Sequence, residues 1–396
     1  MNLLAILPVL CALWWGSAVA VLLLSFAAAL AHPLRKERPT AAGEHLPLSA
    51  VVPIEFMHCD FGNAQRSLFA QDYEGLEIVF SARRAGTPAI AAASRIRDEF
   101  PAIQSRFVQS HGNDAVSPKL NTMWQGICDA RNDLILTKDS NLSLGPGEVA
   151  DLVRHFRPGV GLVSAISIAT DPQSFAAWIE TSIINCYHAR ILMLGDAAGL
   201  GFGLGKVMLF RRSDLMRAGG FDELAWALGE DMALARAMGG LGLRTVLAAR
   251  VSRQKLGRRS FSDLWRRQLR WMVVWRVQLP AVFAGDMLGA ALPTALVGAV
   301  AASFFGFAPG IVALGTLAGW FCVEFLLCAA KGWPLSPWSP IAFIAREMLT
   351  PVLWLRACTT SQVVWAGAVR KAVRKAEFAG CAGSQAMSRL AADRNK

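Results

Sequence analysis

Two short segments of the sequence contain the side chains best suited to chemistry. An isolated acidic pair, Glu230-Asp231, follows a glycine and precedes the helical run from Met232 to Met238. Further along the chain lies the basic motif Arg-Gln-Leu-Arg-Trp, at residues 267–271. A carboxylate can take a proton from an attacking hydroxyl, and arginines at i and i+3 can grip one diphosphate. As alternatives, acidic residues often stabilise a first helical turn, and the arginines also suit a solvated interfacial face.

A candidate cation site follows another apolar run. The run covers residues 134–137, and Asp139-Ser140-Asn141 comes soon after it. A carboxylate at a strand end, with a second oxygen ligand at Asn141, can hold a divalent cation against a diphosphate. Because Asp, Ser and Asn all favour turns, a plain turn is the alternative interpretation.

Three other segments are weaker candidates. Lys119 lies in Ser-Pro-Lys-Leu-Asn at residues 117–121, where a loop enters a helix, and is a candidate phosphate partner. His188 lies in a stretch rich in apolar residues, where a lone histidine is more often structural than catalytic. The glycine-rich run from Gly199 to Gly205 does not match a dinucleotide fingerprint. We interpret it as a flexible loop or a close-packed turn near the acceptor.

The composition is too apolar for an ordinary soluble domain, with 54% hydrophobic residues and a mean hydropathy of +0.37. Residues 1–31 carry no charged side chain, and a second charge-free run extends from Met287 to Val323. A helix needs roughly 20 apolar residues to cross a bilayer. The first run therefore predicts one span, and the second predicts two short spans broken near Pro309-Gly310. A cleaved signal peptide is the alternative for the first run, but that run lacks a basic start.

The net charge of +11 is concentrated beside the apolar segments. Between Arg253 and Arg276 there are eight Arg or Lys residues and one Asp. This placement suits lipid headgroups and phosphates, and the interleaved tryptophans are more typical of interfacial anchors than of nucleic-acid binding. Basic residues follow the first apolar run and none precedes it, which predicts a cytoplasmic central domain. The eight cysteines are scattered without a C-x-x-C pair, so we expect neither a disulfide framework nor a zinc site.

The central region alternates between β-type apolar runs and helical patterns, which predicts an α/β domain with a mostly parallel sheet. In such sheets, ligands bind beyond the carboxyl ends of the strands. The predicted strands are Leu48 to Ile54, Leu76 to Phe80, Leu134 to Thr137, Gly161 to Ile168 and Leu243 to Val251.

The region from Phe261 to Pro280 carries apolar residues at helical spacing with arginines between them, which predicts an amphipathic helix in the membrane interface. The apolar segment from Ile341 to Leu355 contains Arg346-Glu347. If this segment crossed the membrane, the basic tail would lie outside, against the charge rule. We therefore expect a re-entrant or interfacial helix there.

Taken in order, these motifs resemble those of the ceramide glucosyltransferase-like family of inverting, GT-A-fold, membrane-bound glycosyltransferases. The resemblance runs nearly end to end, and it is the combination of motifs that is specific. The matching segments are the N-terminal anchor, Phe69-Ala70-Gln71-Asp72-Tyr73, Thr87-Pro88-Ala89-Ile90, Ser117-Pro118-Lys119-Leu120-Asn121, Asp139-Ser140, His188-Ala189-Arg190, Gly219-Gly220, Glu230-Asp231, R-x-x-R-W and Arg346-Glu347.

The resemblance implies roles for individual residues. Asp139 would bind the metal and the donor, and Asp231 would be the general base. Arg267, Arg270 and Trp271 would hold the nucleotide diphosphate. His188 matches a histidine that eukaryotic members use at the active site.

One position departs from the family pattern. The family has an aspartate before Pro-Ala that helps to bind the uridine nucleotide, and Thr87 stands there instead. Thr at an N-cap with Pro88 at N1 is favourable helix chemistry, so we expect the fold to survive. Arg83 or Arg84 can contact the nucleotide instead. Ser117, where the family usually has Asn, is a milder change.

The resemblance implies an enzyme that moves a hexose from a UDP-sugar to a lipid hydroxyl, with Mg²⁺ or Mn²⁺ as cofactor. Ceramide and diacylglycerol are the candidate acceptors. A catalytically weakened relative that binds lipid or nucleotide and a polysaccharide-type transferase are the alternatives. The high Ala content and the lack of eukaryotic sorting signals suggest a multi-pass bacterial inner-membrane protein. The expected organisation is an N-terminal transmembrane anchor (1–31), a linker (32–46), a GT-A catalytic domain (47–260), an interfacial amphipathic helix (261–285), a transmembrane hairpin with a re-entrant or third apolar helix (286–358) and a basic cytoplasmic tail (359–396).

Overall fold

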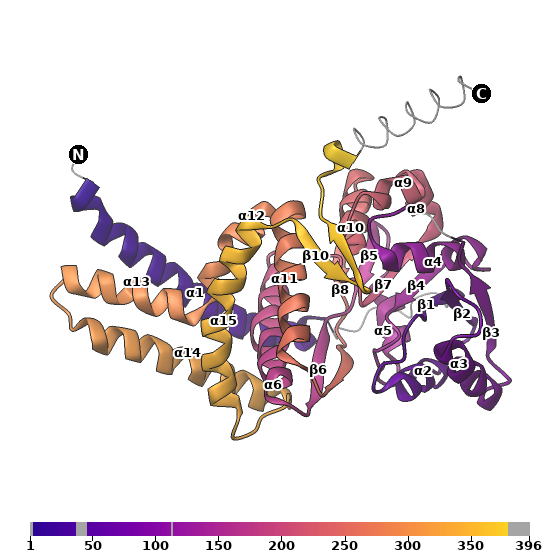
Figure 1. Cartoon of the computed structure of the whole chain (residues 1–396), viewed down its shortest axis with the longest axis horizontal. Helices are drawn as coiled ribbons and strands as arrows, with labels where there is room; N and C mark the ends of the chain where they lie inside the picture. The colour runs from indigo at the N-terminus through magenta and orange to yellow at the C-terminus, as the bar shows by residue number, and fades with distance from the viewer. Residues whose placement is uncertain (1–2, 37–45, 112–113, 379–396) are drawn as a thin grey trace.

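The computed structural model of the chain describes residues 3–36, 46–111 and 114–378. A sheet domain with helices on both faces forms one end of the molecule, and a group of long helices forms the other (Figure 1). The first and last long helices of the chain both belong to this helical end. The N-terminal helix therefore packs beside segments that follow the sheet domain in sequence.

The main sheet has seven strands in the order β3-β2-β1-β4-β7-β5-β8. Four of its neighbouring pairs are parallel, and only β7 runs antiparallel to its two neighbours. The predicted α/β fold class with a mostly parallel sheet is therefore confirmed. The strands are β1 (Leu48–Pro53), β2 (Leu76–Ala82), β3 (Gln104–Gln109), β4 (Leu134–Lys138), β5 (Val160–Ser164), β7 (Val207–Arg211) and β8 (Arg244–Leu247).

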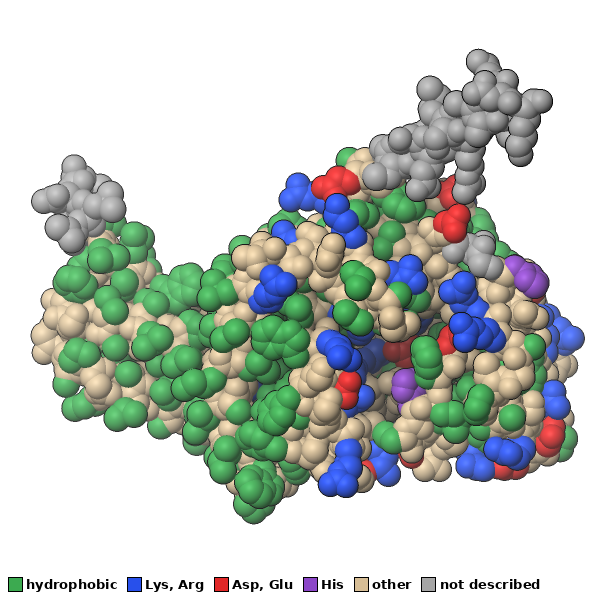
Figure 2. Space-filling view, viewed as in Figure 1, with side chains coloured by type: hydrophobic (Ala, Val, Ile, Leu, Met, Phe, Trp, Pro, Cys, Tyr) green, Lys and Arg blue, Asp and Glu red, His purple; other side chains and the backbone are tan. Residues whose placement is uncertain are grey.

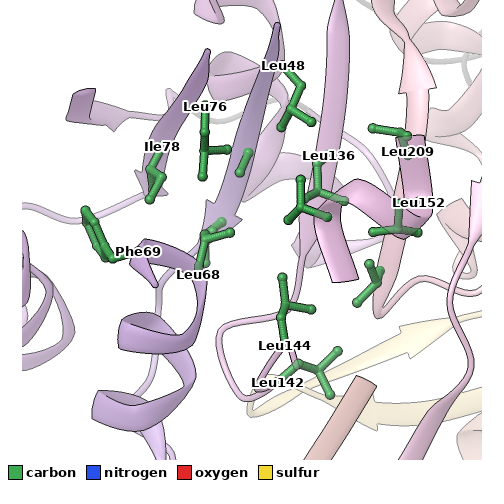
Figure 3. Packing of buried hydrophobic residues seen from close by; sticks show 14 of the residues in the cluster. Leu48, Leu68, Phe69, Leu76, Ile78, Leu136, Leu142, Leu144, Leu152 and Leu209 are labelled. Atoms are coloured by element: carbon green, nitrogen blue, oxygen red, sulfur yellow. The ribbon is translucent and has the colours of Figure 1, made fainter. Parts of the chain in front are cut away.

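Alternating side chains of the central strands build a core on each face of the sheet. Ala50 and Val52 of β1 pack on one face and Val51 on the other, as the two-residue period of a strand requires. The first core includes Leu68 and Leu136 and is seen closely in Figure 3. It lies under α2 (Phe61–Phe69), α3 (Pro88–Glu99) and α5 (Glu148–His155), whereas the second core lies under α4 (Pro118–Asp129), α8 (Arg212–Arg217), α9 (Gly220–Ala225) and α10 (Glu230–Gly240).

The expected strand from Gly161 to Ile168 is wrong as a single element. The chain leaves the main sheet after Ser164 and enters β6 (Ser167–Pro172), which pairs in parallel with β9 (Ser252–Gly257) in a separate two-stranded sheet. The expected strand from Leu243 to Val251 is likewise shorter, because β8 ends at Leu247. The residues that follow Ser164 and Leu247 are still buried. Burial therefore keeps both apolar runs longer than the strands themselves.

Ser or Thr caps begin several helices that carry site residues. Thr87, Ser117 and Ser260 have extended backbone, and each side-chain oxygen accepts a hydrogen bond from the backbone N–H three residues on. Thr87 is followed by Pro88 at the first helical position, as predicted. Ser260 also forms a reciprocal capping box with Asp263. Each cap of this kind is worth about 1 kcal/mol to its helix.

The helical end begins with α1 (Leu3–Lys36), which continues through the start of the predicted linker at 32–46; residues 37–45 of that linker lie outside the described residues. By length and hydropathy, two described helices can cross a membrane, Ile6–Pro33 within α1 and Pro309–Lys331. A third crossing is formed if the helices Pro280–Gly289 and Ala291–Phe304, which are bent by 68° at their junction, count as one span. The C-terminal helices are α11 (Phe261–Gln278), α12 (Pro280–Gly285), η2 (Asp286–Gly289), α13 (Ala291–Phe304), α14 (Pro309–Lys331) and α15 (Ser339–Thr359).

Buried charges join the helical end to the sheet domain. Arg346 of α15 lies 2.7 Å from both Glu324 of α14 and its neighbour Glu347. Glu324 also lies 3.6 Å from Arg190, the first residue of α7 (Arg190–Ala197), which precedes β7 in the chain and packs on α1. Glu347 accepts a 2.9 Å hydrogen bond from the backbone N–H of Leu292 in α13. All four charged side chains are almost fully buried, so none of them can exchange its partners for water without opening this joint.

After α15 the chain returns to the sheet domain as a β-hairpin. Strands β10 (Gln362–Trp365) and β11 (Ala368–Lys371) pair antiparallel around the turn residues Ala366 and Gly367, which both have positive φ. Figure 1 shows the hairpin, in yellow, between the helical end and the sheet domain. The segment predicted as a basic tail from residue 359 therefore begins with ordered structure.

Candidate active site

Asp139 lies at the carboxyl end of β4, next to the loop that precedes β7. Its backbone N–H donates a 2.9 Å hydrogen bond to the carbonyl of Lys206, and 28% of its side chain is exposed. The buried Lys119 ammonium lies 2.7 Å from Asp139 Oδ1 and 3.4 Å from Glu230 Oε1. Burial opposes the charge on Lys119, but Asp139 and Glu230 outweigh it and raise its pKa. Lys119 therefore stays charged between two carboxylates.

The acidic pair begins α10, as the sequence predicts for a first helical turn. Asp231 Oδ2 accepts a 2.7 Å hydrogen bond from the backbone N–H of Gly205, and Oδ1 accepts one of 2.9 Å from Met232. Burial raises the pKa of Asp231 above its usual range, and the charge of Glu230 raises it further. The carboxylate is therefore fixed in direction and more basic than an exposed aspartate.

Glu230 has a different set of partners. Its Oε2 accepts a 2.8 Å hydrogen bond from Ser117, the N-cap of α4, and its Oε1 faces Lys119. Ser117, one of the two departures from the family pattern, thus caps one helix and holds the acidic residue of another. The two adjacent carboxylates therefore differ in their partners: Glu230 lies within ion-pair distance of Lys119, whereas Asp231 forms no ion pair among the described residues.

The two arginines of the basic motif differ in their surroundings. Arg267 pairs with the buried Glu180 at 3.2 Å and donates a 3.0 Å hydrogen bond to Gln254. Arg270 forms no ion pair with any carboxylate in the described part of the chain, and its guanidinium lies 4.6 Å from the centre of the Trp365 ring. Burial, and then Arg267, lower the pKa of Arg270 to about 10, so it remains charged at neutral pH. Arg270 is therefore a cavity cation that forms no ion pair within the described residues.

His188 lies in a π-helix, η1 (Ser182–Ala189), between α6 (Phe175–Thr181) and α7 (Arg190–Ala197). Such turns are frequent at functional sites. The imidazole packs against Trp271 and Trp275, with ring centres 5.4 and 4.9 Å apart. Burial lowers the pKa of His188 to about 3, with Lys206 adding to the effect. The ring is therefore neutral and can orient a hydroxyl but cannot supply positive charge.

These residues meet around one cavity of about 300 Å³. Figure 2 shows the surface hollowed where the sheet domain meets the helical end, with charged side chains inside the hollow. The apolar part of the lining includes Ile191, Leu192, Leu279 and Val282. The predicted site residues on the cavity are Lys119, Asp139, His188, Asp231, Arg267, Arg270 and Trp271.

Three predicted site residues do not line this cavity. Thr87 is the N-cap of α3, where its hydroxyl accepts a 3.3 Å hydrogen bond from Ile90. Arg84 is exposed on the loop before it. Asn141 lies beyond the end of β4, and its buried side-chain oxygen has no hydrogen-bond partner among the residues that the structure describes. Their roles in binding donor or metal stay predictions.

Asp139 can offer one carboxylate to a divalent cation that is shared with a phosphate group, although in this structure the carboxylate pairs with Lys119. Mg²⁺ is commonly held by one or two carboxylates together with substrate phosphates and water. Asp139 is partly exposed to the cavity and supplies one such carboxylate. Within residues 3–36, 46–111 and 114–378, no three His, Cys, Asp or Glu side chains cluster to hold a metal by themselves.

Three residues in or beside the cavity were not predicted from the sequence. Glu180 is buried and pairs with both Arg259 and Arg267, although it lies far from them in sequence. In the sequence, Glu180 could have been noticed as a lone acidic residue within an apolar helical stretch. Lys206 follows the glycine-rich run and lies 5.8 Å from the Trp271 ring centre. Trp365 lines the cavity from the C-terminal hairpin.

Comparison with known proteins shows the family of the chain. The model of glycosyl transferase family 21 matches residues 12–377. The chain belongs to this family. Ceramide glucosyltransferase 1 from Caenorhabditis elegans is 22% identical over 334 residues, which cover 83% of this chain and 71% of the relative. The protein is thus a glycosyltransferase of family 21, and the predicted resemblance is confirmed.

Solved glycosyltransferase structures are similar at low sequence identity. A mannosyltransferase from Pyrobaculum calidifontis, in complex with GDP-Man and Mn²⁺, is 16% identical, with a TM-score of 0.47; the match covers 87% of this chain and 98% of that one. Glucosyl-3-phosphoglycerate synthase from Mycobacterium tuberculosis, in complex with Mn²⁺, UDP and glucosyl-3-phosphoglycerate, is 15% identical, with a TM-score of 0.38 and coverage of 58% and 79%. Family membership and the mostly parallel sheet together give the chain a GT-A-like fold.

Proposed function

We propose that this family 21 glycosyltransferase moves a hexose from a UDP-sugar to the hydroxyl of a membrane lipid, ceramide or diacylglycerol, with inversion. The observation that carries the proposal is the cavity in which Asp231, Asp139 and Arg270 meet apolar side chains of α7 and α12. A charged donor and an apolar acceptor both find suitable surfaces there.

In the proposed reaction, Asp231 takes the proton from the lipid hydroxyl. The hydroxyl oxygen then forms a bond to the anomeric carbon while the bond from that carbon to the diphosphate breaks, and the diphosphate leaves with the electron pair. The hydrogen bonds from Gly205 and Met232 support this role because they aim the carboxylate. The raised pKa of Asp231 supports it as well, since a more basic carboxylate is the better proton acceptor.

Negative charge develops on the departing diphosphate and needs nearby cations. Arg270 is suited to this because it forms no ion pair with a described carboxylate, whereas Arg267 pairs with Glu180. A preorganised cation in a buried site stabilises such charge more strongly than it would in water. A Mg²⁺ or Mn²⁺ ion held by Asp139 would add Lewis-acid stabilisation of the diphosphate when bound.

The neutral His188 ring lies between Trp271 and Trp275 and also faces the cavity. A neutral imidazole can accept or donate one hydrogen bond to the acceptor hydroxyl without competing with Asp231 for its proton. We assign it to orienting the acceptor.

A membrane lipid is the acceptor that best suits the surroundings. The cavity wall includes Leu279 and Val282, which lie on or next to α12, and α12 continues through η2 into the apolar α13. A lipid headgroup can therefore reach Asp231 while its acyl chains stay beside apolar helices. The C. elegans relative named for ceramide is consistent with this class. We place the protein in a bacterial inner membrane with the sheet domain in the cytoplasm.

The test is expression of the full chain in a host without glycolipids, followed by mass spectrometry of total lipids. Wild-type protein should produce a hexosylated lipid, and Asp231→Asn should lower transfer by about 10²–10⁴-fold while retaining UDP binding. Asp222→Asn is the matched control, because Asp222 also lies in the first turn of a helix but is exposed. Unchanged turnover of Asp231→Asn would exclude this base. Binding of UDP without any lipid product would favour the weakened-relative alternative.

A further inference from the structure

We propose that the hairpin formed by β10 and β11 is a wall of the donor site, in which Trp365 is a positioning residue for Arg270. The inference rests on the proposed function, because it concerns how the diphosphate-binding cation is held. The hairpin follows the last long helix, in a segment (residues 359–376) whose charged side chains are all basic.

The hairpin has an inner and an outer face. Val363 is buried in a cluster with Leu228 and Met272, and Trp365, two residues later, lies on the same face and lines the cavity. Val364 and Val369 point the other way and are 42% and 66% exposed. This alternation is what a two-residue strand period produces when one face is covered. The hairpin is therefore seated on the enzyme by its inner face.

Polar contacts fix the base of the hairpin. Arg276, in the last turn of α11, donates 3.0 Å hydrogen bonds to the carbonyl of Thr360 and to the hydroxyl of Ser361. The backbone N–H of Ala372 donates a 2.8 Å bond to the Ser361 carbonyl and closes the loop. Because Arg270 and Arg276 belong to the same helix, the element that carries the basic motif also anchors the hairpin that contacts it.

The choice of an aromatic partner has a chemical consequence. A carboxylate that held Arg270 would neutralise it, as Glu180 partly neutralises Arg267 at 3.2 Å. The face of Trp365, with its ring centre 4.6 Å from the guanidinium carbon, attracts the cation through the ring quadrupole and adds no negative charge. Arg270 is thus held in position with its full charge available to a diphosphate.

The test compares Trp365→Ala, Trp365→Phe and Val369→Ala in the full-length protein in detergent. We measure the donor KM, kcat and the dissociation constant of UDP in the presence of Mg²⁺. Trp365→Ala should weaken UDP binding and raise the donor KM by about tenfold, as expected for loss of one cation–π contact in a desolvated site. Trp365→Phe should recover most of this loss because the ring face remains. Val369→Ala, on the outer face of the same hairpin, should match wild type.

A double-mutant cycle separates positioning from general damage to the fold. In an Arg270→Gln background, Trp365→Ala should have little further effect on UDP binding, because the cation that the ring positions is gone. Equal losses in both backgrounds, or unchanged UDP binding in Trp365→Ala, would overturn the role of Trp365 and leave the proposed function intact. A wild-type protein that transfers no sugar and binds no UDP would overturn both.

Discussion

Asp231 Oδ2 and the backbone N–H of Gly205 are 2.7 Å apart, and no side chain fits between them. A Cβ atom at Gly205 would lie 2.9 Å from that oxygen, closer than real Cβ contacts allow. We expect Gly205→Ala to displace the carboxylate and lower transfer by about 10²-fold, because a misplaced base loses its alignment with the hydroxyl. Lipid product per minute is the measurement. Gly239→Ala in α10, where a Cβ meets nothing, should keep full activity.

The pH profile should reflect the raised pKa of Asp231. A general base works only when deprotonated, so kcat/KM should fall as the pH drops through this pKa, at a higher pH than for an unperturbed aspartate. Burial and the charge of Glu230 cause the shift, hence Glu230→Gln should move the acid limb to lower pH. The measurement is kcat/KM for the sugar donor as a function of pH, with saturating lipid acceptor. An acid limb that does not respond to Glu230→Gln would contradict the assignment.

Substitution of Arg270 should mainly affect donor binding, whereas substitution of Arg267 should mainly affect stability. Arg270→Gln should raise the donor KM with little loss of stability, because no carboxylate in the described ranges pairs with it. Arg267→Gln removes one of two cations paired with the buried Glu180 and should lower the free energy of unfolding by about 3 kcal/mol. Thermal unfolding in detergent and donor titrations distinguish the two. Equal stability losses would show that the pairing with Glu180 is unimportant.

Thr87 can be tested as both a cap and a departure from the family. Thr87→Ala should cost about 1 kcal/mol of stability, because the backbone N–H of Ile90 loses its acceptor. Thr87→Asp should keep the cap and, by the family resemblance, lower the donor KM. Unfolding midpoints and donor kinetics are the measurements. A Thr87→Asp variant with unchanged donor KM would place the nucleotide away from this loop.

Local sequence patterns predicted much of this fold. The strands at 48–54, 76–80 and 134–137 follow from short apolar runs, and the helix from Phe261 follows from its apolar spacing and is capped by Ser260. The strand β3 carries Gln, Ser and Arg at an edge of the sheet, and β9 carries Arg and Lys, so neither has an apolar run to reveal it. Strand β7 is central and antiparallel, an order that local patterns do not encode.

The site was predicted where motifs are local and missed where partners are distant. The acidic pair and the basic motif are each recognisable from a few neighbouring residues, and the structure brings both to one cavity. The pairing of Glu180 with Arg267 and the contact of Trp365 with Arg270 join segments that only the tertiary fold brings together. For Trp365, the Ala366-Gly367 turn and the short apolar run at residues 363–365 were readable in the sequence, but the basic charge of the segment favoured a tail.

The ion pairs between Arg190, Glu324 and Arg346 mean that α14 and α15 are not interchangeable with other hydrophobic helices. A soluble fragment that ended before α13 would carry Arg190 with its counter-charge removed from a buried position. Replacing α14 with an unrelated hydrophobic helix would have the same defect. The full chain with its own C-terminal helices is therefore the form to purify and to engineer, because the buried carboxylate that pairs with Arg190 lies on α14.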